Sequence, residues 1–214
     1  FSDMMGQRGG STVLTEVPEM FGAEGFLMDR CINKEVFGKA EHMINGFKEY
    51  FISHNEVVYD NPSPGNKQGG ITTLEDKSCG CVQKGGSSPI CGVLSYGQRV
   101  QNRGLTVLQT PGNDLVSTTA LAAAGVHMVL FTTGRGTPFA GPVPTLKIST
   151  NTALAQRKPQ WIDFNAGTLV QGDSWDDAAE TLLDRVMATA SGLATCSENL
   201  GYRELAIWKD GVTL

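Results

Sequence analysis

Short segments rich in β-branched residues alternate with helical segments along this chain, and that alternation constrains the fold more than any other feature. Strands are predicted at residues 11–17, 89–94, 106–109, 126–132 and 145–149, with weaker candidates at 162–164 and 206–208. Strands that alternate with helices are typical of α/β proteins with a largely parallel sheet. We therefore expect an α/β fold in which a mostly parallel sheet is flanked by helices in a three-layer-like arrangement, within one domain over residues 1–214.

The strongest helices are predicted from capping residues and from apolar side chains spaced three or four residues apart. Asn33 is expected to cap a helix that runs to about Ile52. Its apolar face is formed by Phe37, Ala40, Ile44, Phe47 and Phe51. A second helix is expected to begin at Ser174 and to end at Gly192. Its buried stripe is formed by Ala179, Leu182, Leu183, Val186 and Ala190.

The composition excludes several classes of protein. The net charge of −5 argues against a nucleic-acid-binding surface. The longest apolar stretch, residues 120–131, is too short to cross a membrane, so no membrane partner is expected. The chain has 5 cysteines, and this odd number favours a reduced, cytoplasmic protein over a disulfide framework. Glycine is in excess, with 26 of 214 residues against a usual ~7%.

Part of this glycine lies in a polar loop at residues 61–70. The loop combines two prolines and three glycines with Asn61, Ser63, Asn66 and Lys67. It leads into a predicted helix over residues 72–84, and the free backbone N–H groups at a helix start favour an anion. The positive charge of Lys67 favours an anion further.

Two further polar loops directly follow predicted strands. Residues 132–138 contain Thr133, Arg135 and Thr137, and a guanidinium suits a carboxylate or a phosphate. Residues 111–114 end at Asp114, where an alanine-rich helix begins. Ligands bind at the carboxyl ends of parallel strands, so we expect these loops to converge on an anionic or polyhydroxylated small molecule. For each loop alone, ordinary turn chemistry is an equal alternative.

Glu16 and His127 are the remaining candidates for chemistry. Glu16 lies at the end of a predicted strand, where it can bind a metal or accept a proton, whereas Glu19 and Glu24 complement helix dipoles. His127 lies within a buried-strand pattern near the second loop. A hydrogen-bonded core histidine is the simpler reading there, and acid–base catalysis is the alternative.

Five long segments together resemble the altronate/galactarate dehydratase family, and the resemblance runs along the whole chain. They are LTEVPEMFGAE (14–24), NPSPGNKQGGITTLEDKS (61–78), PGND (111–114), HMVLFTTGRGTP (127–138) and RELAIWKDGVTL (203–214). Members of this family are longer and carry an N-terminal and a middle domain. The resemblance therefore implies that this chain, which begins at Phe1, corresponds to the C-terminal domain alone.

The resemblance also implies a reaction and a cofactor. The family dehydrates sugar acids; for D-altronate, the α-proton and the C3 hydroxyl are lost to give 2-dehydro-3-deoxy-D-gluconate in hexuronate catabolism. A divalent metal, Fe²⁺ or Mn²⁺, is associated with the family and would stabilise the enediolate as a Lewis acid. The expected partners are an aldonate and the remaining domains of the parent chain, and the possibility of a homo-oligomer is left open.

Roles follow as hypotheses for the residues within these motifs. Arg135 and Lys67 bind the substrate carboxylate or stabilise the enediolate, Glu16 or Asp114 binds metal or moves protons, and His127 protonates the leaving hydroxyl. The substrate hydroxyls are bound by Asn61, Ser63, Asn66, Thr133 and Thr137.

Two rival interpretations remain at this point. One is an elimination of the sulfolactate sulfo-lyase type, which expels sulfite instead of water. The other is a structural or dimerisation module, with all the chemistry on the rest of the parent protein.

Overall fold

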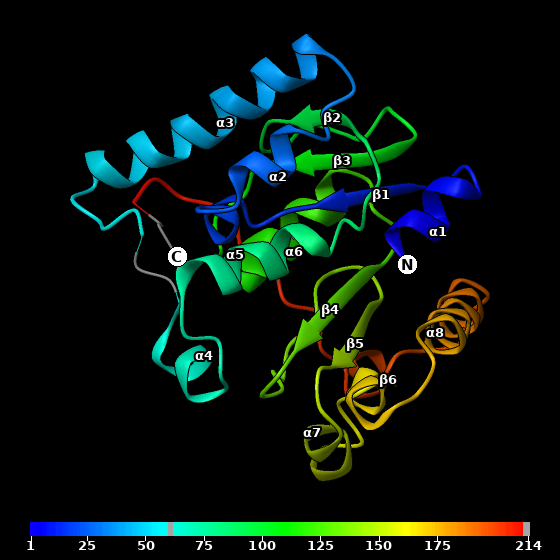
Figure 1. The fold of residues 1–214 in the computed structure, drawn as a ribbon. Coiled ribbons are helices and arrows are strands. Elements are labelled where there is room, and N and C mark those ends of the chain that lie inside the picture. The colour runs from blue at the N-terminus through cyan, green and yellow to red at the C-terminus, as the bar shows by residue number, and fades with distance from the viewer. Residues whose placement is uncertain (60–61, 212–214) are drawn as a thin grey trace. The chain divides into compact units, whose positions relative to one another are not determined.

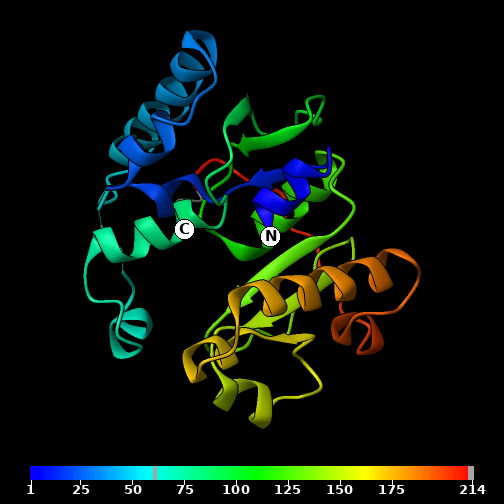
Figure 2. The ribbon, with the colours of Figure 1, turned by 45° about the vertical axis from the view of Figure 1, so that its right-hand side comes forward.

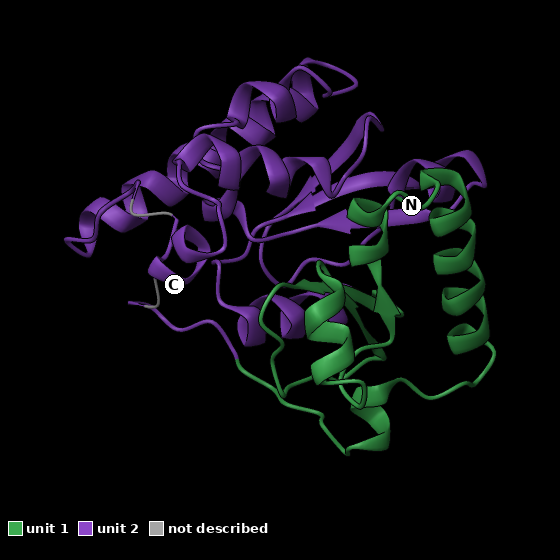
Figure 3. Cartoon of the chain, turned by 60° about the horizontal axis from the view of Figure 1, so that its bottom comes forward, with its two compact units in different colours: residues 1, 126–206 green, residues 2–125, 207–214 purple. Residues whose placement is uncertain are grey.

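The chain forms two compact units, which are described separately (Figure 3). The structure, a computed structural model, describes residues 1–59 and 62–211. Unit 1 contains Phe1 and Val126–Ala206, and unit 2 contains Ser2–Gly125 and Ile207–Leu214. The chain therefore passes into unit 1 after Gly125 and returns to unit 2 after Ala206.

Unit 2 is built on a sheet of three parallel strands in the order β1-β3-β2 (Figure 1). These strands are β1 (Ser11–Leu14), β3 (Gly104–Leu108) and β2 (Ile90–Leu94). The central strand β3 pairs with both neighbours, and all of its residues after Gly104 are buried. A central parallel strand is covered on both faces and is mostly apolar, so the sequence predicts a strand here, at 106–109; the observed strand begins two residues earlier and ends one residue earlier.

Seven helical segments surround this sheet within the described part of unit 2. They are α1 (Ser2–Gln7), η1 (Val17–Met20), α2 (Glu24–Met28), α3 (Lys34–Ser53), α4 (Pro64–Gln68), α5 (Leu74–Gln83) and α6 (Asp114–Ala123). The predicted cap of α3 is confirmed, because the Asn33 side chain accepts a hydrogen bond of 2.9 Å from the Val36 amide. The prediction that Phe37 lies on the buried face of α3 is wrong. Phe37 is 41% exposed, and the preceding residue, Val36, is buried in its place.

The core of unit 2 gathers aromatic side chains from segments far apart in the sequence. Phe21 follows η1 and makes an edge contact with Phe51 of α3, with ring centroids 6.2 Å apart. Phe47 of α3 stacks on Trp208 at 5.2 Å, so the chain that returns from unit 1 completes this cluster. Each buried ring of this size contributes about 1.5–3 kcal/mol of burial free energy.

Unit 1 contains a second sheet of three parallel strands in the order β4-β5-β6. The strands are β4 (Val129–Thr133), β5 (Thr145–Ser149) and β6 (Phe164–Asn165), and the helical segments are α7 (Thr152–Arg157), η2 (Ala166–Gln171), α8 (Trp175–Ala190) and α9 (Cys196–Asn199). Asp163 joins these elements, since its fully buried carboxylate accepts hydrogen bonds from Lys147 N, Arg185 Nη2 and Cys196 N.

The predicted α/β class is confirmed, with two differences. The parallel strands form two separate sheets of three strands each. Residues 206–208 are not a strand, because the Trp208 amide donates to the Tyr96 hydroxyl at 3.0 Å and pairs with no neighbouring strand. The apolar stripe predicted for α8 is only half-buried, and Ala190 is exposed.

Two further features bear on the expectations from composition. All 5 cysteines are free thiols. Among the described residues, no helix combines the length and apolar character that crossing a membrane requires.

Candidate functional site

Glu16 lies two residues beyond β1, which ends at Leu14 and is shorter than the predicted strand over 11–17, and its backbone is held in an unusual conformation. Its φ of 64° places it in the left-handed region, which costs a residue other than glycine about 1–3 kcal/mol. The buried side chain of Thr110, beyond β3, accepts a hydrogen bond of 3.0 Å from the Glu16 amide. The neighbouring Val17 amide donates to the Thr110 carbonyl at 3.2 Å. The ends of β1 and β3 therefore fix Glu16 together.

The loop after β3 lies beside the same carboxylates. Asn113 caps α6, since its side chain accepts a hydrogen bond of 3.2 Å from the Val116 amide, and Asp114 is the first residue of that helix. A Cβ atom at Gly112 would lie 3.1 Å from Oε1 of Glu19, so only glycine lets Glu19 approach this loop without displacement. Glu16, Glu19 and Asp114 are close enough for both neighbours to raise the pKa of Glu16.

Lys77 of α5 and Lys84, which caps the C-terminal end of that helix, supply the positive charges of this cluster. Lys77 Nζ lies 2.9 Å from Glu19 Oε2, and Lys84 Nζ lies 3.5 Å from Glu16 Oε2. Lys77, Cys81 and Lys84 are spaced four and three residues apart, so they share one face of the helix end. Sequence reasoning missed both lysines, although their spacing within the predicted helix over 72–84 was a usable signal.

Burial and charge shift the proton affinities within this acid–base cluster, which consists of Glu16, Glu19, Asp114, Lys77, Cys81 and Lys84. Burial raises the pKa of Glu16. The negative charges of Glu19 and Asp114 raise this pKa further, and the two lysines only partly offset the increase. Burial also raises the pKa of the Cys81 thiol, which favours its protonated form. Burial works against the charge of Lys84, but Glu16, Cys81 and Glu19 outweigh it and raise the pKa of that ammonium.

This arrangement suits proton transfer. A carboxylate with a raised pKa is a better proton acceptor near neutral pH than an ordinary surface glutamate. The side chain of Glu16 is 20% exposed and that of Lys84 is 42% exposed, so both are accessible to a ligand. Perturbed titratable groups at strand ends are a frequent property of catalytic sites.

The same residues do not form a metal centre by themselves. Among the described residues, no group of three or more His, Cys, Asp or Glu side chains is arranged to hold a metal ion. A typical protein site for Fe²⁺ or Mn²⁺ takes several such ligands. Glu16 and Asp114 therefore do not fit a complete ligand set for Fe²⁺ or Mn²⁺.

The polar residues of the first predicted loop lie apart from this cluster. Ser63 caps the short helix α4, and its hydroxyl donates to the Asn66 side chain at 2.8 Å. Lys67 is exposed within α4. In Figures 1 and 2, α4 lies at the periphery of unit 2, on the far side of α5 from the strands. Asn61 lies outside the described residues.

The second predicted loop belongs to unit 1, and we call residues 133–137 the arginine loop. Thr133 ends β4, and its hydroxyl oxygen accepts a hydrogen bond of 3.0 Å from the Gly136 amide. The Asn151 side chain donates to the Gly134 carbonyl at 3.0 Å. Arg135 is exposed and has no carboxylate partner among the described residues, so its guanidinium is available to an anion. Thr137 is half-buried. The convergence of all three loops stays a prediction.

The expected position of His127 is wrong. It lies in a bend before β4, at the opposite end of that strand from the arginine loop, and its side chain is exposed. The reason is local: α6 ends near Gly125, whose φ is 91°, and the strand begins only at Val129. His127 was assigned as the acid because it was expected near the second loop, and this position does not support that assignment.

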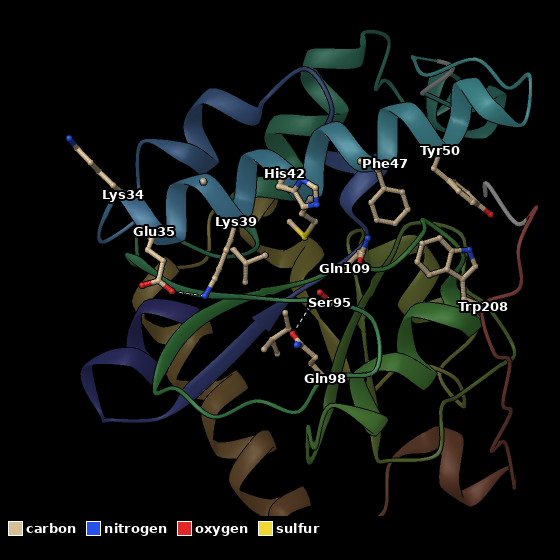
Figure 4. Close-up of a pocket in the computed structure, with 15 residues that line it drawn as sticks. Lys34, Glu35, Lys39, His42, Phe47, Tyr50, Ser95, Gln98, Gln109 and Trp208 are labelled. Carbon is tan, nitrogen blue, oxygen red and sulfur yellow. Dashed lines mark hydrogen bonds and ion pairs between the residues drawn. The ribbon is translucent and has the colours of Figure 1, made fainter.

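A groove of about 720 Å³ lies between α3 and the carboxyl ends of β2 and β3 in unit 2 (Figure 4). Lys39, His42 and Tyr50 of α3 line it, opposite Gln109 and Trp208. None of the site residues predicted from the sequence lies among those that line this groove. We therefore assign the candidate site to the acid–base cluster.

Comparison with known proteins identifies a family and several relatives. The family described as D-galactarate/altronate dehydratase, C-terminal, matches residues 1–213. The chain is 58% identical to altronate dehydratase of Escherichia coli strain K12 and 57% identical to that of Bacillus subtilis strain 168, in each case over 100% of this chain and 43% of the relative. It is 36% identical to galactarate dehydratase (L-threo-forming) of Escherichia coli strain K12, over 97% of this chain and 40% of that protein.

These relatives are more than twice as long as the part that the chain matches, since it spans 43% of the first two. The match nevertheless extends along the whole of the chain. The chain therefore belongs to the D-galactarate/altronate dehydratase C-terminal family.

Proposed function

We propose that this chain is the C-terminal part of a hydro-lyase that dehydrates D-altronate to 2-dehydro-3-deoxy-D-gluconate. The observation that carries the proposal is the half-buried Glu16 carboxylate, with its raised pKa and the accessible Lys84 ammonium 3.5 Å away. The choice of D-altronate over galactarate rests on the relatives, because identity is higher to the altronate dehydratases than to the galactarate dehydratase.

The reaction needs a base and a positive charge. The C2 proton lies α to the substrate carboxylate and is only weakly acidic, so its removal must be accompanied by stabilisation of the enediolate that forms. In the proposal, Glu16 accepts this proton, and Lys84 lies beside the developing negative charge. The protonated Glu16 then returns its proton to the C3 hydroxyl, which leaves as water, and the resulting enol tautomerises to the 2-keto acid.

The remaining assignments stay predictions for the full-length protein. Arg135 and Lys67 are proposed to bind the substrate carboxylate, and Ser63, Asn66, Thr133 and Thr137 to bind hydroxyl groups. The requirement for Fe²⁺ or Mn²⁺ is proposed for the full-length protein as a whole. A cytoplasmic location is proposed with it.

The test uses the full-length protein that carries this chain, supplied in parallel with D-altronate, galactarate and sulfolactate. We expect a 2-keto-3-deoxy product from D-altronate and no sulfite from sulfolactate. Glu16→Gln should reduce turnover by at least about 100-fold, because removal of a general base costs that much. Glu41→Gln, which changes an exposed carboxylate of α3, is the matched control and should leave turnover unchanged.

Each contrary result identifies a different failure. Release of sulfite from sulfolactate without turnover of altronate would replace the dehydratase by a sulfo-lyase. Full activity of Glu16→Gln on altronate would remove Glu16 from the chemistry. Full activity of Glu16→Gln, Arg135→Ala and Lys84→Met together would leave this chain as a structural or dimerisation module of the parent enzyme.

A further inference from the structure

A lysine is buried in the centre of unit 1. Lys147 lies in the middle of β5, the central strand of the sheet, and is only 1% exposed. Burial of an ammonium group is costly unless the group is paired or hydrogen-bonded. A buried lysine at this position therefore requires an explanation from its surroundings.

Two aromatic rings and a backbone carbonyl lie beside the side-chain nitrogen of Lys147. Its Nζ lies 5.7 Å from the ring centre of Phe131 and 5.4 Å from that of Phe139, and these two rings are in edge contact. Phe131 is also the residue of β4 that pairs with Lys147 in the sheet. The ammonium donates a hydrogen bond to the carbonyl oxygen of Thr137. Aromatic faces stabilise a desolvated cation, so the rings compensate part of the cost of burial.

This hydrogen bond connects the core of unit 1 to the arginine loop. The loop is already fixed at Gly134 by the Asn151 side chain and at Gly136 by the Thr133 hydroxyl. Lys147 adds an attachment at Thr137, from inside the unit. Arg135 lies between these attachments, and its own guanidinium is exposed.

A methionine would fill nearly the same space between Phe131 and Phe139, but it would donate no hydrogen bond to Thr137. What the lysine adds over a methionine is therefore the hydrogen bond that attaches the loop. A loop with fewer accessible conformations loses less entropy when a ligand binds.

We propose that Lys147 is a positioning residue for the arginine loop: it holds Thr137 so that Arg135 faces outward in the conformation that binds the carboxylate of a sugar acid. The role in binding rests on the proposed function, whereas the attachment of the loop does not. The two parts are therefore tested with separate measurements.

The first measurement is amide hydrogen exchange over residues 132–140 in the full-length protein. In the wild type, the Gly136 amide should be protected relative to the exposed residues around it. Lys147→Met should accelerate exchange in this segment by about tenfold or more. Lys158→Met is the matched control, because Lys158 also lies beside Gly136 but packs its ammonium 4.0 Å above Trp161. It should leave the exchange of the loop unchanged.

The second measurement is turnover of D-altronate by the same variants. Lys147→Met should raise KM by about tenfold with a smaller change in kcat, since loss of a preorganised binding group acts mainly on affinity. Arg135→Ala should lose more activity than Lys147→Met, because it removes the binding group itself. Lys147→Arg, which keeps the charge and the donor, should recover part of the affinity.

The outcomes separate the two claims. Rapid exchange of Gly136 in the wild type, or unchanged exchange in Lys147→Met, would overturn the attachment of the loop. Rapid exchange in the wild type would overturn it even if Lys147→Met fails to fold. If Lys147→Met changed the hydrogen exchange of residues 132–140 but left KM for D-altronate unchanged, the role of Lys147 in binding would be overturned. Absence of altronate turnover in the wild type would overturn the proposed function and leave the exchange result standing.

Discussion

The side-chain nitrogen of Lys84 lies 3.5 Å from Oε2 of Glu16, a longer and more exposed ion pair than the neighbouring one between Lys77 and Glu19 at 2.9 Å. The Lys84 side chain is 42% exposed, against 22% for Lys77. A long, open ion pair can exchange its partner for a ligand at less cost than a short, closed one. The two pairs on one helix therefore have separable roles.

The first prediction compares Lys84→Met with Lys77→Met in the full-length protein. Loss of Lys84 removes the positive group nearest to Glu16, so the pKa of Glu16 should rise further and the pH at which activity appears should move upward. Turnover at neutral pH should fall, and Lys84→Arg should restore part of it. Lys77→Met should reduce thermal stability more than activity. A pH–rate profile that is identical in Lys84→Met and the wild type would contradict the assignment.

The second prediction concerns the stability of Glu16→Gln. Because the pKa of Glu16 is raised in the folded state, its ionisation disfavours folding, and the associated stability is lost as pH rises through the folded pKa. Glutamine does not ionise. The variant should therefore match the wild type in acid and become relatively more stable as pH increases.

Thermal unfolding of the wild type and of Glu16→Gln, measured from acid to alkaline pH, gives the difference in stability between them. Glu41→Gln serves as the exposed control and should show no such trend. If the stability of Glu16→Gln relative to the wild type fell as pH increased, the raised pKa of Glu16 would be contradicted. The same variant is expected to lose activity, which would make Glu16 a site where function reduces stability.

The third prediction has the opposite dependence on pH. The carboxylate of Asp3 in α1 accepts hydrogen bonds of 3.0 Å from the Ser87 amide and further bonds from the Ser87 and Ser88 hydroxyls. Burial tends to raise the pKa of Asp3, but the hydrogen bonds outweigh it and the pKa is lowered. The stability that Asp3 contributes is therefore present above its unfolded pKa and is lost as pH falls through the folded pKa.

Urea unfolding of Asp3→Asn tests this. The variant should be less stable than the wild type at neutral pH, and the difference should shrink as the solution is acidified. Asp29→Asn, at an exposed position, should show no comparable change. A difference that is constant with pH would assign the effect of Asp3 to packing alone.

The fourth prediction concerns Asp163 and a thiol in unit 1. Burial and the neighbouring Asp163 raise the pKa of Cys196 to about 11. Asp163→Asn removes the negative charge, so the pKa of Cys196 should fall and its thiol should react faster with iodoacetamide at mildly alkaline pH. The variant should also lose about 3 kcal/mol of stability, because the Arg185 guanidinium loses its buried partner.

Alkylation followed by mass spectrometry measures the reactivity at a temperature where the variant is folded. Asp173→Asn, which changes an exposed aspartate, should leave the reactivity of Cys196 unchanged. Unchanged alkylation in Asp163→Asn would show that burial alone sets the pKa of this thiol.

Local features of the fold were well predicted from the sequence. The caps at Asn33 and Ser174 and the strand Thr145–Ser149 are found where capping chemistry and β-branched runs indicate them. These features depend on a few neighbouring residues, so they can be read without knowledge of the rest of the chain. The separation of the strands into two sheets depends on pairing between distant segments, which no local pattern specifies.

The candidate site was predicted only in part for a similar reason. Glu16 and Asp114 were recognisable because each follows a strand of the same sheet. Lys77 and Lys84 were not predicted as site residues, because their contacts with these carboxylates arise from the packing of α5 beside η1, which lies far away in the sequence. His127 was misplaced because an apolar run does not show at which residue a strand begins.

The return of the chain to unit 2 has a consequence for synthesis on the ribosome. The stack between Phe47 and Trp208 joins residues that are separated by the whole of residues 126–206. A nascent chain is made from its N-terminus, so all of residues 126–206 emerge before Trp208, while this aromatic cluster still lacks its indole ring. The first unit to begin folding is thus the last to be completed. Its hydrophobic surface around Phe47 must stay soluble until then, and a chaperone that recognises exposed aromatic groups would find it available during that interval.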